Sequence, residues 1–280
     1  LSEHRDQDSD ELEIMRKALV LGLQDFVKKN KKKRVHLGLS GGIDSALVAA
    51  LAVDALGPAR VSAVMLPGPY SSPGSVTDAE ALAKNLKIKV HRVDINKMYQ
   101  ESLAAAQAFD SEGVKKGSVT DQNLQARLRA VVLMAYSNQK DSMLLSTSNK
   151  SEIAAGFCTL YGDSCGGLAP IGDLTKTQVY ALSKLYNKER EIIPQAILDK
   201  KPSPELAPGQ KTQDTLPEFS ELDPAIENLV VEKKQAKTDV EKWLQMAIYK
   251  NEFKRWQAPP ILRVSEHAFG RGRRIPLAKT

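Results

Sequence analysis

The stretch from residue 38 to residue 45 combines glycines, hydroxyl side chains and one carboxylate in a pattern that could bind phosphate. It consists of Gly38, Leu39, Ser40, Gly41, Gly42, Ile43, Asp44 and Ser45. The paired glycines have no Cβ to hold phosphate oxygens away, and the serine hydroxyls can donate hydrogen bonds to those oxygens. No lysine follows the glycines, so the stretch differs from the G-x-x-x-x-G-K-[ST] phosphate loop.

The carboxylate of Asp44 indicates that such a site also needs a cation. A carboxylate next to phosphate is repulsive unless a divalent cation lies between them, so Asp44 predicts a bound Mg²⁺. Glu152, far along the chain, could supply a second carboxylate to the same ion. The alternative is a plain strand-to-helix turn, in which Ser40 caps the helix and Asp44 stabilises its first turn.

The residues around this stretch predict the elements that position it. Val35, Leu37 and Leu39 recur with the period of a strand, whereas apolar residues from Leu47 to Ala55 recur with helical spacing up to Gly57. The turn therefore lies at a helix N-terminus, where unpaired backbone N–H groups and the helix dipole favour an anion.

The rest of the chain alternates in the same way. An amphipathic helix is expected over 9–29, strands over 61–66, 88–93 and 142–146, helices over 76–86 and 95–108 and from residue 121, and a mobile polar loop over 110–120. This alternation predicts an α/β fold with a doubly wound parallel sheet and right-handed crossovers. Ligands bind beyond the carboxyl ends of such strands, so the turn over 147–152, which opens a further helix, should neighbour the first turn.

Composition narrows the function classes. No stretch approaches the roughly 18 apolar residues of a membrane helix, and no secretory signal opens the chain, so we expect a cytoplasmic protein without membrane contact. The net charge of +6 is spread along the chain and aromatic residues make up only 5% of it, so we expect small anionic substrates and no nucleic acid. Cys158 and Cys165 are expected to be reduced thiols.

Several blocks together carry a family resemblance. The S-G-G-x-D-S residues match the PP-loop signature of enzymes that split ATP into AMP and pyrophosphate. Further blocks follow in family order at 123–127, 146–152, 161–163, 173–178 and 201–206. The ordered set resembles the NAD synthetase family, and the tail at 254–260 and 268–274 is similar to the synthetase domain of its glutamine-dependent branch. The departures from the family pattern are Ser148, Leu168 and Trp256.

The resemblance implies a domain organisation and a reaction. The whole chain, 1–280, would be one PP-loop amidation domain of the adenine-nucleotide α-hydrolase-like fold, with 223–280 as a helical and basic extension. The reaction would convert deamido-NAD, ATP and ammonia into NAD, AMP and pyrophosphate through a nicotinyl adenylate.

The resemblance also assigns roles to single residues. Besides Gly38 to Ser45, ATP would contact Thr147, Lys176 and Ser203, and Mg²⁺ would bind Asp44 and Glu152. Mg²⁺ on Asp44 and Glu152, together with Lys176 and the Gly38 to Ser45 amides, would neutralise charge on the departing pyrophosphate. Asp163 would accept a proton from ammonia. The residues expected to bind deamido-NAD are Arg127, Leu160, Gly167, Lys254 and Arg255. Lys176 would lie near a helix N-terminus, where a cation is locally unfavourable, and this favours a functional role for it.

The sequence also bears on the assembly of the protein, on its nitrogen source and on alternative functions. The resemblance implies a homodimer. No part of the chain resembles a glutaminase, so we expect ammonia-dependent activity in isolation. Two nitrogen sources stay open for the parent protein: free ammonia, and a glutaminase domain or subunit outside this chain. The absence of an initiator methionine suggests an excised domain. Two rivals stay open: another PP-loop amidating or thiolating enzyme, and a non-catalytic nucleotide-binding or RNA-binding protein that uses 270–274.

Overall fold

The computed structural model describes residues 2–109 and 112–270, with side chains from residue 10 onward. The strands are β1 (Arg34–Gly38), β2 (Val61–Met65), β3 (Lys89–Arg92) and β4 (Ser142–Leu144). The helices of the sheet region are α1 (Ser2–Lys29), α2 (Ile43–Leu56), α3 (Pro73–Leu86), α4 (Asn96–Ala106), α5 (Val119–Lys140), α6 (Lys150–Ala155), α7 (Lys176–Tyr186) and α8 (Gln195–Asp199). Three more follow: α9 (Phe219–Ile226), α10 (Asp239–Lys250) and α11 (Glu252–Arg255).

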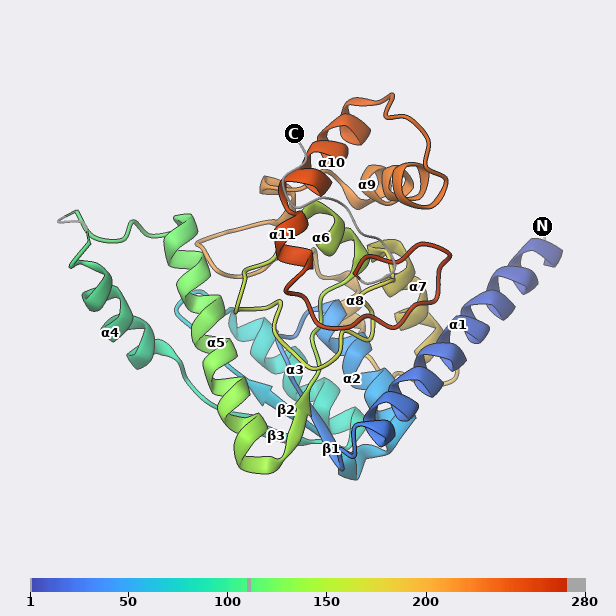
Figure 1. Cartoon of the computed structure of the whole chain (residues 1–280). Coiled ribbons are helices and arrows are strands. Elements are labelled where there is room, and N and C mark those ends of the chain that lie inside the picture. Colours follow the sequence, from blue (N-terminus) through green and yellow to red (C-terminus); the bar gives the residue numbers. More distant parts are fainter. Residues whose placement is uncertain (1, 110–111, 271–280) are drawn as a thin grey trace.

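The four strands form one parallel sheet in the order β3-β2-β1-β4. The chain builds outward from β1 through β2 to β3 and then returns to pair β4 on the other side of β1 (Figure 1). The strand order therefore reverses between β1 and β4, and open α/β sheets bind ligands at the carboxyl side of such a switch point. This confirms the predicted α/β fold and places the loops after β1 and β4 at that position.

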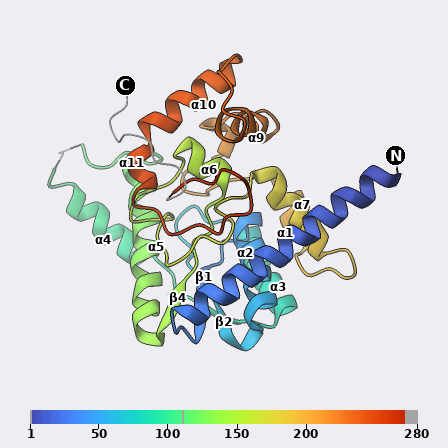
Figure 2. The ribbon, with the colours of Figure 1, turned by 45° about the vertical axis from the view of Figure 1, so that its right-hand side comes forward.

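The two faces of the sheet are covered by different helices. Val35 and Leu37 of β1 are fully buried in the larger core, which includes residues of α1, α2, α3 and α7. His36, between them, points to the opposite face, where its Nε2 lies 3.0 Å from the carbonyl oxygen of Leu133 in α5. Figure 2 shows α1 running diagonally across the outside of the layer that contains α2. This alternation of side chains follows the two-residue period of the sequence.

The C-terminal helices form a smaller unit with its own core. Leu222 and Ile226 of α9 pack with Leu244 and Ile248 of α10 and with residues of α6. These helices stand above α6, at the carboxyl end of the sheet (Figure 1). The first of them begins at Phe219, four residues before the boundary expected at 223. The basic residues expected to end this extension, 271–280, lie outside the described residues.

Other element boundaries differ by a few residues from the sequence-based prediction. Helix α6 begins at Lys150 with Asn149 as its cap, whereas we expected the turn around Thr147 to open it directly. Helix α5 begins at Val119, inside the expected loop over 110–120, because Ser118 caps it by accepting from the Asp121 amide. In the described part of the chain, no helix has both the length and the apolar character needed to cross a membrane.

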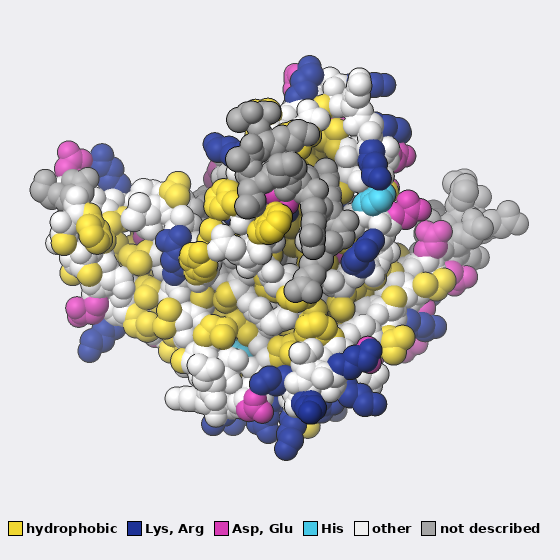
Figure 3. All heavy atoms as spheres, in the orientation of Figure 1, with side chains coloured by type: hydrophobic (Ala, Val, Ile, Leu, Met, Phe, Trp, Pro, Cys, Tyr) yellow, Lys and Arg dark blue, Asp and Glu magenta, His cyan; other side chains and the backbone are white. Residues whose placement is uncertain are grey.

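Surface charge is uneven in the space-filling view. Lys and Arg side chains gather along the lower edge of Figure 3, at the end of the molecule where α1 meets β1. That end carries the run Lys31 to Arg34, and it lies at the amino side of the sheet, away from the glycine loop.

Candidate active site

The glycine loop connects β1 to α2 in a tight, glycine-dependent geometry. Gly41 has a φ of +77°, and a Cβ at this position would lie 2.1 Å from the carbonyl oxygen of Ser75. Only glycine fits there for two reasons. A residue with a side chain would be strained at this positive φ, and its Cβ would clash with the start of the neighbouring helix. Gly42 caps α2 with φ −96° and makes no side-chain cap hydrogen bond, so the alternative with Ser40 as the helix cap is wrong.

The serine side chains brace this loop from inside. The hydroxyls of Ser40 and Ser45 lie 3.1 Å apart, and the Ser45 hydroxyl donates to the carbonyl of Gly42 at 3.0 Å. The amide of Gly42 donates to the Ser40 hydroxyl at 3.2 Å. These hydrogen bonds fix the loop at the start of α2, where the helix dipole is positive.

Asp44, Glu152 and Lys176 meet beside the loop although they lie far apart in sequence. Lys176 Nζ is 2.6 Å from Oδ2 of Asp44 and 3.7 Å from Oε1 of Glu152. The lysine side chain is only 2% exposed, and its ammonium also lies 5.3 Å from the ring centre of Phe219. Lys176 begins α7 but is buried against two carboxylates, so it is not a solvated first-turn lysine.

Asn149 completes this group, although it is not among the site residues expected from the sequence. Its Nδ2 donates to Oδ1 of Asp44 at 2.8 Å, while its Oδ1 accepts from the amide of Glu152 at 3.0 Å. Glu152 closes a capping box with the Asn149 amide. One buried side chain therefore caps α6 and fixes the orientation of Asp44. The available signal was the capping-box spacing Asn149 to Glu152.

The charged side chains in this group shift one another's pKa values. Burial and the nearby Asp44 raise the pKa of Glu152 to about 7. Burial alone would lower the pKa of Lys176, but Asp44 and Glu152 outweigh it and raise that pKa above its ordinary value. Two carboxylates share one region with a single cation, and additional positive charge there would relieve their repulsion. This donor set fits Mg²⁺, which usually takes one or two carboxylates together with substrate phosphates and water.

Buried polar contacts hold the elements that carry these groups. Asp223 of α9 accepts from the Thr177 amide at 2.7 Å and from the Ser151 hydroxyl, so it joins the starts of α7 and α6. Lys150 Nζ and Asp173 Oδ1 form an ion pair of 2.9 Å with both side chains at most 2% exposed. Asp173 also accepts from the amides of Val264 and Ser265. None of these residues was singled out from the sequence as part of the site.

Thr147 and Asp163 lie on the segments that surround this group. Thr147 is half-buried in the loop after β4, two residues before Asn149. Asp163 accepts from the Thr159 amide at 2.7 Å, and it is solvent-exposed in the turn that follows α6. The surrounding protein partly desolvates its carboxyl and thereby raises the pKa of Asp163, although contact with solvent limits that effect.

The residues expected to bind deamido-NAD fall into two groups. In the first, Arg127 Nε donates to the carbonyl of Leu160 at 3.1 Å, so α5 and the segment after α6 are tied together at an exposed position. Gly167 follows in the same segment, where its amide donates to the carbonyl of Leu144 at 2.8 Å and a Cβ would meet Met143 at 2.8 Å.

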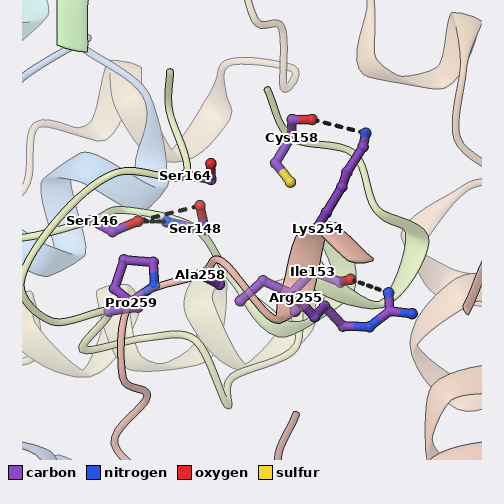
Figure 4. Close-up of a pocket in the computed structure, with 10 residues that line it drawn as sticks. Ser146, Ser148, Ile153, Cys158, Ser164, Lys254, Arg255, Ala258 and Pro259 are labelled. Carbon is purple, nitrogen blue, oxygen red and sulfur yellow. Dashed lines mark hydrogen bonds between the residues drawn. The ribbon is translucent and has the colours of Figure 1, made fainter. Parts of the chain in front are cut away.

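Lys254 and Arg255 form the second group and point in different directions around a cavity of about 20 Å³ (Figure 4). Lys254 Nζ donates to the carbonyls of Gly156 and Cys158 at 2.8 and 3.0 Å. Arg255 is 5% exposed and pairs with Glu252 at 2.8 Å while donating to the carbonyls of Ile153 and Ala154. Lys254 is partly buried and Arg255 is buried, and the guanidinium of Arg255 is hydrogen-bonded to the protein itself.

Ser203 lies on an exposed loop after α8. Its hydroxyl donates to the carbonyl of Gln210 at 2.6 Å. Glu205, two residues on, accepts from the Ser72 amide and from the hydroxyls of Ser72 and Ser75. Because Ser75 also backs Gly41, this contact joins the Ser203 loop to the glycine loop.

Comparisons with known proteins bear on what this arrangement does. The family model described as NAD synthase matches residues 15–258. A glutamine-dependent NAD(+) synthetase of Synechocystis is 45% identical over 274 residues, which cover 94% of this chain and 48% of that protein. The chain therefore spans about half the length of the curated relatives it matches.

Two solved structures are similar in both sequence and fold. A glutamine-dependent NAD+ synthetase from Acinetobacter baumannii in complex with adenosine diphosphate is 34% identical with a TM-score of 0.66, over 95% of this chain and 49% of that one. An NMN synthetase from Francisella tularensis is 30% identical with a TM-score of 0.75, over 87% of this chain and 95% of that one.

Proposed function

This chain belongs to the NAD synthase family, and on that basis we propose that it carries out the ATP-dependent amidation of deamido-NAD to NAD. ATP would be cleaved to AMP and pyrophosphate, and ammonia would attack the nicotinyl adenylate formed in the first step. The observation that carries the proposal is the convergence of Asp44, Glu152 and Lys176 beside the Gly41 loop. A nucleotide-binding protein without chemistry has no need for two carboxylates around a buried lysine.

The first step brings one anion against another. The nicotinate carboxylate would attack the α-phosphorus, so positioning and positive charge must supply most of the acceleration. Lys176 would neutralise charge on the departing pyrophosphate, with the hydroxyls of Ser40 and Ser45 and the α2 N-terminus at the same oxygens. Thr147 and Ser203, on the flanking loops, would contact the nucleotide.

We propose that Asp44 and Glu152 hold Mg²⁺ when the nucleotide binds. The two carboxylates would hold the ion, and the ion would supply positive charge where negative charge develops on the phosphates. Two observations support this proposal. Asn149 contacts Asp44 and caps the helix that carries Glu152. Burial first, and then repulsion from Asp44, raise the pKa of Glu152, and a bound cation would offset both effects.

The second step needs a proton acceptor for ammonia. We propose Asp163, because it is a carboxylate in the segment that also carries Leu160 and Gly167. Arg127 and Lys254 tie that segment to α5 and α11, so they would shape the deamido-NAD site. For Arg255 we propose a positioning role, since its donors are used by Glu252 and by backbone carbonyls.

The similarity to an NMN synthetase raises a second candidate substrate, nicotinate mononucleotide. The direct test is to incubate the chain with ATP, Mg²⁺, ammonium and either deamido-NAD or nicotinate mononucleotide. We expect kcat/KM to favour deamido-NAD. Preference for the mononucleotide would assign the second activity, and no AMP with either would refute the proposal.

Assembly and location stay predictions. We propose a homodimer, which the apolar outer face of α5 supports, because Val131 and Met134 are 58% and 42% exposed there. We also propose that the parent protein obtains ammonia from a glutaminase domain or subunit, as the names and lengths of the relatives suggest. The cytoplasmic location expected from the sequence is part of the same proposal. Sedimentation equilibrium would test the dimer.

A further inference from the structure

A second hollow lies at the amino end of the sheet, opposite the glycine loop. Its volume is about 270 Å³. The first residues of β1, β2 and β3 line it, together with the last turns of α5 and the short helix η1 (Pro58–Arg60). Its position follows from the fold. At the amino end of β2 the side chain facing α5 is the small Ser62, whereas Val64 further along packs against α5 residues.

The lining of this hollow is strongly basic. Arg34, Lys87, Lys89 and Lys140 all border it, and no aspartate or glutamate does. None of these four side chains forms an ion pair within the described part of the chain. The nearby Asp141 interacts electrostatically with Arg34, but it pairs with Lys32 and is 72% exposed. Four like charges around one concavity repel one another, and this repulsion falls when an anion enters.

Two aromatic donors complete the lining. The rings of His91 and Tyr136 meet edge to face with centres 5.2 Å apart. Burial first, and then Lys89 and Lys140, lower the pKa of His91. An anion bound among the lysines would offset their lowering of the His91 pKa. The imidazole of His91 and the phenol of Tyr136 could then donate hydrogen bonds to that anion.

We propose that this hollow binds a small phosphate-bearing anion, at a site separate from the catalytic loops. Lysine and arginine side chains with a histidine and a tyrosine are the groups that bind phosphate oxygens in proteins. The concave shape favours a compact di- or triphosphate group over an extended chain. An RNA strand would need an open basic track with aromatic residues along it.

The test uses the complete chain, inorganic pyrophosphate without Mg²⁺, and the NMR signals of the histidine side chains. Because the probe can also enter the glycine loop, the readout has to be local. His91 reports on the hollow, and His267, in the C-terminal segment, serves as the reference. Variants with single His→Gln changes assign the signals. We expect a saturable shift of the His91 signal and none for His267.

Matched variants then separate specific binding from general charge. Lys89→Gln with Lys140→Gln removes two cations of the hollow, and Lys242→Gln with Lys250→Gln removes two exposed cations of α10. We expect at least about tenfold weaker binding in the first pair and unchanged binding in the second. Equal weakening in both pairs, or a His91 signal that stays constant at millimolar pyrophosphate, would overturn the proposal. An oligouridylate that shifts His91 at lower concentration than pyrophosphate would replace it with RNA binding.

Discussion

Asn149 donates a 2.8 Å hydrogen bond to Asp44 across 105 positions of sequence, and the same side chain caps the helix that carries Glu152. The two carboxylates of the site are therefore held by one amide. The two polar atoms of this amide have different roles. The Nδ2 group orients Asp44, and the Oδ1 atom caps the N-terminus of α6. A substitution that keeps one function and removes the other can separate catalysis from stability.

Asn149→Ser should make that separation. Serine is a good helix cap, so the melting temperature should stay near that of the wild type. The hydrogen bond to Asp44 is lost, and we expect turnover or Mg²⁺ affinity to fall by about 10-fold to 100-fold, as for other groups that orient metal ligands. Asn149→Ala is the control that loses both functions, with about 1 kcal/mol less stability. Wild-type Mg²⁺ dependence in the serine variant would show that Asn149 acts only as a cap.

Gly41→Ala should damage the nucleotide site much more than Gly42→Ala. At Gly41 the new Cβ would meet the Ser75 carbonyl, and the positive φ adds a strain of about 1–2 kcal/mol. At Gly42 φ is −96° and the nearest atom is the Ser40 hydroxyl at 3.3 Å. Thermal melting and the KM for ATP should both show the difference. Similar behaviour of the two variants would contradict the geometry described for the loop.

Local patterns were enough to predict the scaffold and the glycine loop. The period of Val35, Leu37 and Leu39 and the glycine stop at Gly57 depend on neighbours in sequence, and the structure has β1 and α2 there. The general rules for parallel sheets predict the doubly wound arrangement, whereas the order β3-β2-β1-β4 comes from the structure. Asp44 beside Glu152 could be expected because both follow strands that end at the same edge.

Long-range contacts could not be predicted in this way. Arg255 lies in a basic run that suggests a solvated or ligand-binding surface, yet it is buried because Glu252 and the carbonyls of α6 satisfy its donors. The pairing of Lys150 with Asp173 is supported by Ser265, more than 90 positions further along the chain, whose hydroxyl contacts both side chains at 2.8 Å. Neither arrangement leaves a periodic signal in the chain.

His36 should make the fold sensitive to acid. Burial lowers the pKa of His36 to about 4, below its ordinary value of 6.5. The unfolded chain therefore binds a proton that the folded chain does not as pH falls from 6.5 to 4, and stability falls with it. The loss of folding free energy should reach a few kcal/mol once the pH lies below the pKa of His36 in both the unfolded and the folded chain. Each unit of difference between these two pKa values contributes about 1.4 kcal/mol.

Urea denaturation across this pH range would measure that loss. In His36→Gln the difference between pH 7 and acid should be smaller than in the wild type, whatever the stability of the variant at neutral pH. An unchanged pH dependence in His36→Gln would mean that another group is responsible.

The nitrogen source can be tested with this chain alone. We expect ammonium to support NAD formation and ammonia-free glutamine to support almost none. At fixed total ammonium, turnover should climb as pH rises from about 7 toward 9, because unprotonated ammonia is the proposed nucleophile. Efficient use of glutamine would reveal an amidotransferase site within the chain, and Cys158 and Cys165 would be the residues to substitute first.

The central claim is that the nicotinate carboxylate of deamido-NAD attacks the α-phosphorus of ATP next to Asp44 and Lys176. Deamido-NAD labelled with ¹⁸O in its carboxylate tests it directly, because the attacking oxygen stays on phosphorus when ammonia displaces AMP. With ATP, Mg²⁺ and ammonium, we predict NAD, AMP carrying one ¹⁸O, and unlabelled pyrophosphate in equal amounts. Asp44→Asn should slow this turnover by about 10² or more. Release of ADP and orthophosphate, or AMP without the label, would contradict the account.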